Sequence, residues 1–167
     1  MPEIPDSLQI PPQERRAALD ECYQHISEWK VAMPPAVPLV LDFGLGDFDR
    51  FGLYEFWIAN EMEAGYCGKY MFVKDGQMCP RHCHRIKHET FFVMKGALRV
   101  TMDNEEFVLK EGETLAIAPN QVHSFEGIGP TLMLELSMPC DPSDNVFEQP
   151  EAMAWLHRNI GVPAASA

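Results

Sequence analysis

Four side chains in the middle of the sequence could bind a metal ion: His82, His84, Glu89 and His123. His82 and His84 would project to the same side of an extended strand, because side chains two positions apart share a face. A turn would return Glu89 on the neighbouring strand, and His123 follows on a later one. Three imidazoles and one carboxylate suit Mn, Fe, Co, Ni or Zn and leave coordination positions open for water or substrate. We therefore predict a site for one divalent metal ion.

Cysteines beside these histidines raise an alternative, a zinc site, since thiolates bind zinc well. Cys79 and Cys83 do not have the Cys-x-x-Cys spacing of a zinc knuckle. On a strand, Cys83 would also point away from His82 and His84. We interpret both cysteines as packing residues. The total of five cysteines is odd and fits reduced thiols better than a disulfide framework.

The elements that would position the ligands are short strands. In the central part of the chain, β-branched and aromatic runs are each closed by Gly, Asp, Asn or Pro. Lys95–Gly96 and Asp103–Asn104 are short enough to form hairpin turns. Strands at a spacing of roughly 8 to 12 residues indicate an all-β jelly-roll barrel, which manages its edge strands well. The predicted strands cover residues 53–59, 68–74, 89–94, 97–102, 106–109, 114–118, 123–126 and 131–138.

Helices are predicted on both sides of this barrel. Apolar side chains fall on one face of an amphipathic helix over residues 13–31, and the Pro-rich stretch 33–38 ends it. A second helix is predicted over residues 150–160, with Pro150 suited to its start and Gly161 just past its end. The expected parts are an N-terminal helical extension over 1–38, a barrel over 39–149, and a C-terminal helix and tail over 150–167.

Composition and charge exclude several classes of partner. The 167 residues are 46% hydrophobic and 23% charged, which is typical of one globular domain. A net charge of −12 would repel both nucleic acid and an anionic membrane surface. The N-terminal residues have no basic segment followed by an apolar one, and no apolar run reaches about 18 residues. We therefore expect a cytoplasmic protein that binds neither nucleic acid nor membranes.

The metal-binding stretch resembles the first motif of the cupin superfamily. Its fixed positions are a glycine, a His-x-His pair, a glutamate and a second glycine, met here by Gly76, His82, His84, Glu89 and Gly96. The second cupin motif resembles residues 112–123, which end on His123, with Ala118 and Asn120 in place of the usual Pro and Gly. Asn tolerates the left-handed conformation that this Gly supplies. The resemblance implies a cupin double-stranded β-helix barrel.

The residues around the ligands also resemble the D-lyxose isomerase family. These are metal-dependent cupins that interconvert D-lyxose and D-xylulose, and often D-mannose and D-fructose. The resemblance implies a free sugar as substrate, Mn as the first choice of metal with Co, Fe, Ni or Zn as alternatives, and a homodimer. It rests on residues 43–53, 68–69, 73–77, 87–89, 119–125, 135–137 and 144–147.

Isomerising an aldose to a ketose moves a proton between adjacent carbons, which needs a Lewis acid, a base and a cation near the oxyanion. Glu135 is the candidate base, because on a late strand of a cupin it would border the cavity. Lys87, two residues before Glu89, could stabilise the oxyanion or move a proton between oxygens. Lys69 precedes the metal-binding strand and is the candidate ligand for a sugar hydroxyl.

Two rival functions fit the same ligands. An Fe(II)-dependent dioxygenase of a small organic substrate could use three histidines and one glutamate equally well. A metal-binding cupin without catalysis is the other alternative. It predicts that Glu135 and Lys87 lie far from the metal.

Overall fold

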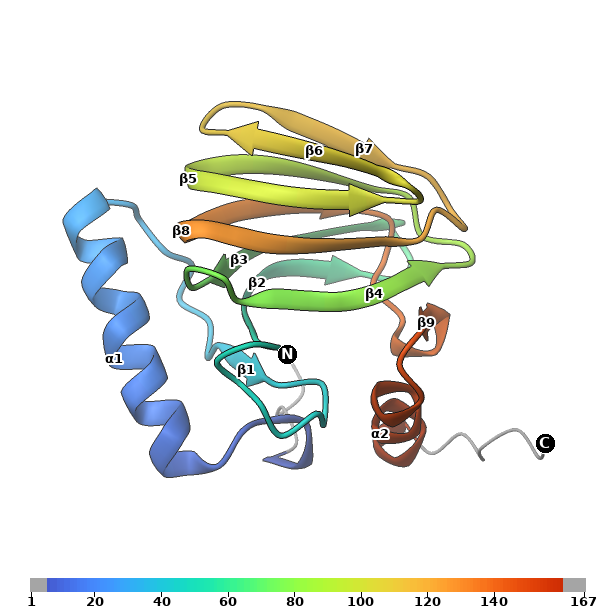
Figure 1. Ribbon diagram of the computed structural model, residues 1–167, viewed down its shortest axis with the longest axis horizontal. Helices are drawn as coiled ribbons and strands as arrows, with labels where there is room; N and C mark the ends of the chain where they lie inside the picture. Colours follow the sequence, from blue (N-terminus) through green and yellow to red (C-terminus); the bar gives the residue numbers. More distant parts are fainter. Residues whose placement is uncertain (1–5, 161–167) are drawn as a thin grey trace.

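The computed structural model describes residues 6–160, and within them nine strands form one curled sheet (Figure 1). All strand pairs between named strands are antiparallel. The predicted all-β cupin-type barrel is confirmed. The strands are β1 (Leu39–Leu41), β2 (Leu53–Glu61), β3 (Tyr66–Val73), β4 (Met78–His84), β5 (Glu89–Met102), β6 (Glu105–Lys110), β7 (Thr114–Ile117), β8 (His123–Ser137) and β9 (Asn145–Phe147).

Two long strands, β5 and β8, hold the sheet together. They pair with each other along most of their length, from Glu89 opposite Ser137 to Met102 opposite His123. The first part of β8 also pairs with β4, and its last part pairs with β3. The sheet therefore curls around β8, which brings the end of β4 and the starts of β5 and β8 to the same interior.

One of the two predicted hairpins is wrong. Asp103–Asn104 does connect β5 to β6, since Met102 pairs with Glu105. Gly96, however, lies inside β5, where the register shifts on both sides of Lys95. Its φ is +81°, and an added Cβ would lie 2.4 Å from the Pro130 carbonyl oxygen. This glycine marks a bulge and a close backbone approach, which produce the same sequence signal as a turn.

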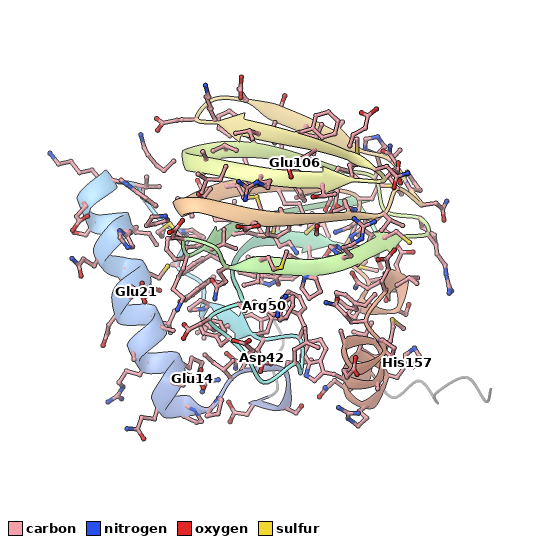
Figure 2. The ribbon with its side chains drawn as sticks, in the orientation of Figure 1. Glu14, Glu21, Asp42, Arg50, Glu106 and His157 are labelled. Carbon is pink, nitrogen blue, oxygen red and sulfur yellow. The ribbon has the colours of Figure 1, made fainter. Side chains whose placement is uncertain are left out.

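The two helices occupy different places around the sheet (Figure 1). Helix α1 (Pro12–Trp29) buries Ala18, Cys22 and Ile26 in a cluster with sheet residues such as Phe72. Its acidic residues Glu14 and Glu21 are exposed (Figure 2). The apolar face of α1 thus covers the chain's own sheet.

Helix α2 (Pro150–Ile160) belongs to the core inside the curl. It buries Ala152, Trp155 and Leu156 against the inner cluster, where the Trp155 and Phe43 rings lie 6.3 Å apart. Short 3-10 helices cover Asp6–Leu8 and Pro142–Asp144. The predicted three-part division has its outer limits outside residues 6–160 and stays a prediction. No helix in the described range is long and apolar enough to cross a membrane.

Candidate metal centre

Three strands bring the four predicted ligands together inside the barrel. His82 and His84 alternate along β4 and point to one side, as their spacing predicts. Glu89 begins β5 and His123 begins β8, where His123 pairs directly with His82. The ligand atoms of the four side chains lie within 4.8 Å of one another, and all four residues are buried.

Backbone carbonyls orient two of these imidazoles. Nδ1 of His82 lies 2.9 Å from the Pro80 oxygen, and Nδ1 of His123 lies 3.0 Å from the Gln121 oxygen. A carbonyl oxygen only accepts hydrogen bonds, so each Nδ1 carries a hydrogen, and in the neutral imidazole Nε2 is then the atom that presents a lone pair to the cluster. Such contacts are the usual way in which a protein fixes the tautomer of a metal-binding histidine.

The donor atoms of the cluster lack partners of their own. Nε2 of His84, Oε1 of Glu89 and Nε2 of His123 are buried without a hydrogen bond. His123 Nε2 and Glu89 Oε1 lie only 2.8 Å apart, although both are acceptors in the tautomer assigned above. Leaving a buried polar atom unsatisfied costs about 1–3 kcal/mol. A cation between these atoms would satisfy all of them, so the residues fit a divalent metal ion.

Electrostatics also favour metal binding by the histidines. Burial lowers the pKa of His82 to about 3 and the pKa of His84 to about 2, with nearby His123 and Lys87 respectively adding to the effect. Both imidazoles are therefore neutral at pH 7, the form that coordinates a metal. The alternative zinc site is not supported, because the cluster found among the described residues contains no cysteine and Cys79 is buried in the apolar core.

A chain of buried ion pairs leads away from the metal cluster, and it includes all three further residues that the sequence predicts. Lys87 Nζ lies 2.7 Å from Glu89 Oε2 and 3.0 Å from Glu135 Oε1. Lys69 Nζ continues the chain, 3.3 Å from Glu135 Oε2 and 2.7 Å from Glu55 Oε1. Charges therefore alternate along five residues, each at most 8% exposed.

Glu135 is at the middle of this chain. It lies on β8 opposite Lys69 of β3, and Ser137 Oγ donates a 2.9 Å hydrogen bond to its Oε1. Burial alone would raise the pKa of Glu135, but Lys69 and Lys87 outweigh that effect and lower the pKa to about 2. The carboxylate is thus held ionised, in the form that can accept a proton.

Both lysines stay charged although they are buried. Burial would lower the pKa of Lys69 and of Lys87, but two carboxylates together outweigh it in each case and raise the pKa: Glu135 and Glu55 for Lys69, Glu135 and Glu89 for Lys87. Lys87 would share a face with Glu89 only if the strand already ran there, and it lies in the connection before β5 begins. Its ammonium group nevertheless reaches the predicted place.

Two residues of the site were missed. Glu55 lies on β2 between the fully buried Tyr54 and Phe56, and a lone carboxylate within a buried apolar run was the signal for it. Asp144 accepts backbone hydrogen bonds from the connection between β4 and β5. Residues 144–147 were considered only as part of the family resemblance, and Asp144 was given no role of its own. The histidines of the helices, His25 and His157, are not part of the metal cluster, and Figure 2 shows His157 on α2.

A cavity of about 1810 Å³ opens from the site toward solvent. Its polar wall includes three of the metal-cluster residues and the whole ion-pair chain, and Trp57 is beside Lys69, with the ammonium nitrogen 5.0 Å from the ring centre. A cavity of this size admits a small polar molecule. A ligand in it could touch the metal site and the ion-pair chain at the same time.

Comparisons with known proteins agree with this architecture. The family model described as "Cupin domain" matches residues 69–137. A D-lyxose/D-mannose isomerase of Thermosediminibacter oceani is 26% identical over 162 residues, covering 78% of this chain and 88% of that protein. A D-lyxose/D-mannose isomerase of Serratia proteamaculans is 30% identical over 148 residues, covering 66% and 65%.

Solved structures with the same fold include two L-ribose isomerases. The Cellulomonas parahominis enzyme has a TM-score of 0.73 at 16% identity, covering 90% of this chain and 97% of that one. The Geodermatophilus obscurus enzyme also has a TM-score of 0.73 at 16% identity, covering 88% and 96%. At these identities the likeness is one of fold, and it extends over most of the chain.

Proposed function

This chain is a cupin that resembles the D-lyxose/D-mannose isomerases, and on that basis we propose that it is a metal-dependent aldose–ketose isomerase acting on a free sugar. The observation that carries the proposal is the buried ion-pair chain. It joins the metal cluster to an ionised carboxylate and two ammonium groups in the wall of one cavity. Keeping five charges out of water is costly for stability alone, which favours a functional reason.

In this proposal His82, His84, Glu89 and His123 hold one divalent ion. When bound, the ion acts as a Lewis acid for the carbonyl and hydroxyl oxygens at C1 and C2 of the open-chain sugar. Neutral His82 and His84 can bind it without first losing a proton. We propose Mn as the native metal, with Co, Fe, Ni or Zn as alternatives that the same donor set accepts.

Glu135 is the group that carries the proton between the two carbons. It is ionised and lies in the cavity wall, and the ammonium groups of Lys87 and Lys69 fix its two oxygens at 3.0 and 3.3 Å. A sugar hydroxyl that takes over the bond to Lys69 would weaken that ion pair and make Glu135 a stronger base. The proton affinity of Glu135 would then increase only when substrate is present.

Lys87 stabilises the negative charge that develops on the sugar oxygen. Its ammonium group lies between a metal-cluster carboxylate and the proposed base, and it remains charged because both neighbours are anionic. Lys69 holds a more distant hydroxyl, and Glu55 keeps Lys69 in place from the other side at 2.7 Å. Both lysines act through a charge that is held in place in a buried site, where each such contact is stronger than in water.

The rival without catalysis predicts that the base and the lysine lie far from the metal cluster. Lys87 is 2.7 Å from Glu89, and Glu135 is one contact further on. This proximity favours an enzyme. D-lyxose and D-xylulose are the proposed pair, with D-mannose and D-fructose second, following the names of the relatives. We also propose a homodimer, in which the exposed Tyr66 and Leu136 on neighbouring strands of the sheet would be covered.

The test is a panel of pentoses and hexoses incubated with Mn-loaded protein in the absence of oxygen, with the ketose product measured. We expect turnover of D-lyxose above the other pentoses. Oxygen consumption in step with substrate loss in an Fe(II)-loaded sample would instead identify the dioxygenase. Absence of any ketose from every sugar, with Mn²⁺ bound, would refute the isomerase.

A further inference from the structure

Asp144 binds the connection between β4 and β5 through three consecutive backbone amides. Oδ1 accepts from the N–H groups of Arg85 and Ile86, each at 3.0 Å, and Oδ2 accepts from the N–H of Lys87 at 2.9 Å. The Asp144 residue is itself 8% exposed. A carboxylate that accepts several backbone hydrogen bonds is a strong, charge-assisted anchor.

The connection needs such an anchor, because its other contacts are at its C-terminal end, where Lys87 pairs with Glu89 and Glu135 and the His88 carbonyl accepts from the Met138 N–H at 3.0 Å. Residues 85–88 belong to no helix or strand, and the side chain of Ile86 is 68% exposed. Apolar packing therefore does not hold this segment. Yet it separates two metal-cluster residues, His84 and Glu89, and it contains Lys87. Movement of this connection would change the distance between His84 and Glu89 and displace the ammonium group of Lys87.

Asp144 is well placed to transmit rigidity, since its own segment is fixed on both sides. It ends the short 3-10 helix that Asp141 caps, and the next residue, Asn145, pairs with His84 across β9 and β4. Before that helix, Asn60 of β2 holds both the N–H and the carbonyl of Cys140, at 2.9 and 3.0 Å. The carboxylate is thus attached to the barrel wall on two sides.

We propose that Asp144 is a positioning residue for the metal centre, setting the spacing of His84 and Glu89 and placing Lys87 against Glu89 and Glu135. The role for Lys87 in turnover rests on the proposed function, while the role for the metal ligands does not. Asp144 touches neither a metal ligand side chain nor the sugar site. It acts through the backbone of the three residues it binds.

The test compares Asp144→Asn with Asp141→Asn in the full-length chain. Asp141 caps the same 3-10 helix and is exposed, and its side chain accepts from the Ser143 N–H rather than from the connection, a bond that the amide oxygen of Asn can keep. Both variants lose one negative charge at nearly the same place, so they match in long-range electrostatics. We expect Asp144→Asn to weaken Mn²⁺ binding by about 10–100-fold, as removal of an outer partner of a metal site usually does. Asp141→Asn should bind Mn²⁺ as the unaltered protein does.

Equal Mn²⁺ affinities of the two folded variants would overturn the proposal. At saturating Mn²⁺ we also expect Asp144→Asn to lower kcat for D-lyxose more than it changes KM, because Lys87 is displaced. Since Mn²⁺ affinity is measured without sugar, a protein that binds Mn²⁺ and isomerises nothing would refute the proposed function and leave this test intact.

A second measurement covers the case in which Asp144→Asn does not fold. Hydrogen exchange of the unaltered protein should show slow exchange at the amides of residues 85–87, although their segment is on the surface and outside any ladder. Exchange of these amides at the rate of an unstructured chain would equally overturn the proposal.

Discussion

Replacing Glu135 by Gln tests the proposed proton carrier separately from metal binding. The change keeps the size of the side chain and removes its charge. Lys69 would then face either an amide N–H or a neutral oxygen, 3.3 Å away, and Lys87 and Ser137 would lose a charged acceptor at 3.0 and 2.9 Å. Because Glu135 does not touch the four ligands, the metal should remain bound.

The size of the effect follows from these contacts. Lys69 keeps Glu55 and Lys87 keeps Glu89, both at 2.7 Å, so neither ammonium group is left without a partner. The expected loss of stability is about 1.5–3 kcal/mol, the value for one hydrogen bond to a charged group. Loss of the proton acceptor should lower kcat by about 10²–10⁴-fold, which is the usual contribution of general acid–base catalysis.

The assay is the initial rate of ketose formation from D-lyxose at saturating Mn²⁺, with bound Mn²⁺ measured in the same sample. Glu126→Gln is the matched control, because Glu126 lies on the same strand and pairs with Arg99 at 3.2 Å outside the ion-pair chain. It should leave turnover unchanged. If Glu135→Gln turned over at the normal rate with Mn²⁺ bound, Glu135 would not be the base and the mechanism would have to be rebuilt.

Three other predictions concern the metal, the outer end of the ion-pair chain and the helix. Mn²⁺ at 100 times its Kd should stabilise the protein by about 2.7 kcal/mol, seen as a higher Tm that EDTA reverses; a His123→Ala variant whose Tm still rises with Mn²⁺ would contradict the assigned ligands. Glu55→Gln should raise KM for D-lyxose more than it lowers kcat, since it loosens Lys69 but leaves Glu135 in place; steady-state kinetics at several sugar concentrations would separate the two, and a pure kcat effect would argue against the hydroxyl-binding role. Phe72→Ala should lower the free energy of unfolding by about 3–5 kcal/mol, because the ring is fully buried beneath α1; urea unfolding measures it, and a loss under about 1 kcal/mol would show that α1 is not packed as described.

What the sequence could predict was mostly local. The orientation of His82 and His84 followed from strand alternation, whereas Glu135 was expected at the cavity because a late strand of a cupin borders it. The turn at Asp103–Asn104 was predicted because its residues alone make the turn. The Lys95–Gly96 prediction failed because a glycine required by a distant carbonyl, that of Pro130, looks the same as a glycine required by a turn.

Features that depend on distant pairing could not be predicted. Glu55 faces Lys69 only because β2 pairs with β3, and neither residue indicates this by itself. Asp144 reaches the amides of residues 85–87 from 57 or more positions away along the chain. Strand β9 is three residues long and exists because it pairs with β4. Such contacts depend on topology, which composition and periodicity do not encode.

We propose that this protein interconverts an aldose and a ketose through its own side chains and one metal ion. The most direct test of this claim is an anaerobic NMR time course of the Mn-loaded protein, begun once from D-lyxose and once from D-xylulose. We predict that both samples reach the same ratio of the two sugars, and that EDTA stops both. Failure of either sugar to convert while Mn²⁺ is bound, or conversion that requires oxygen, would contradict the account.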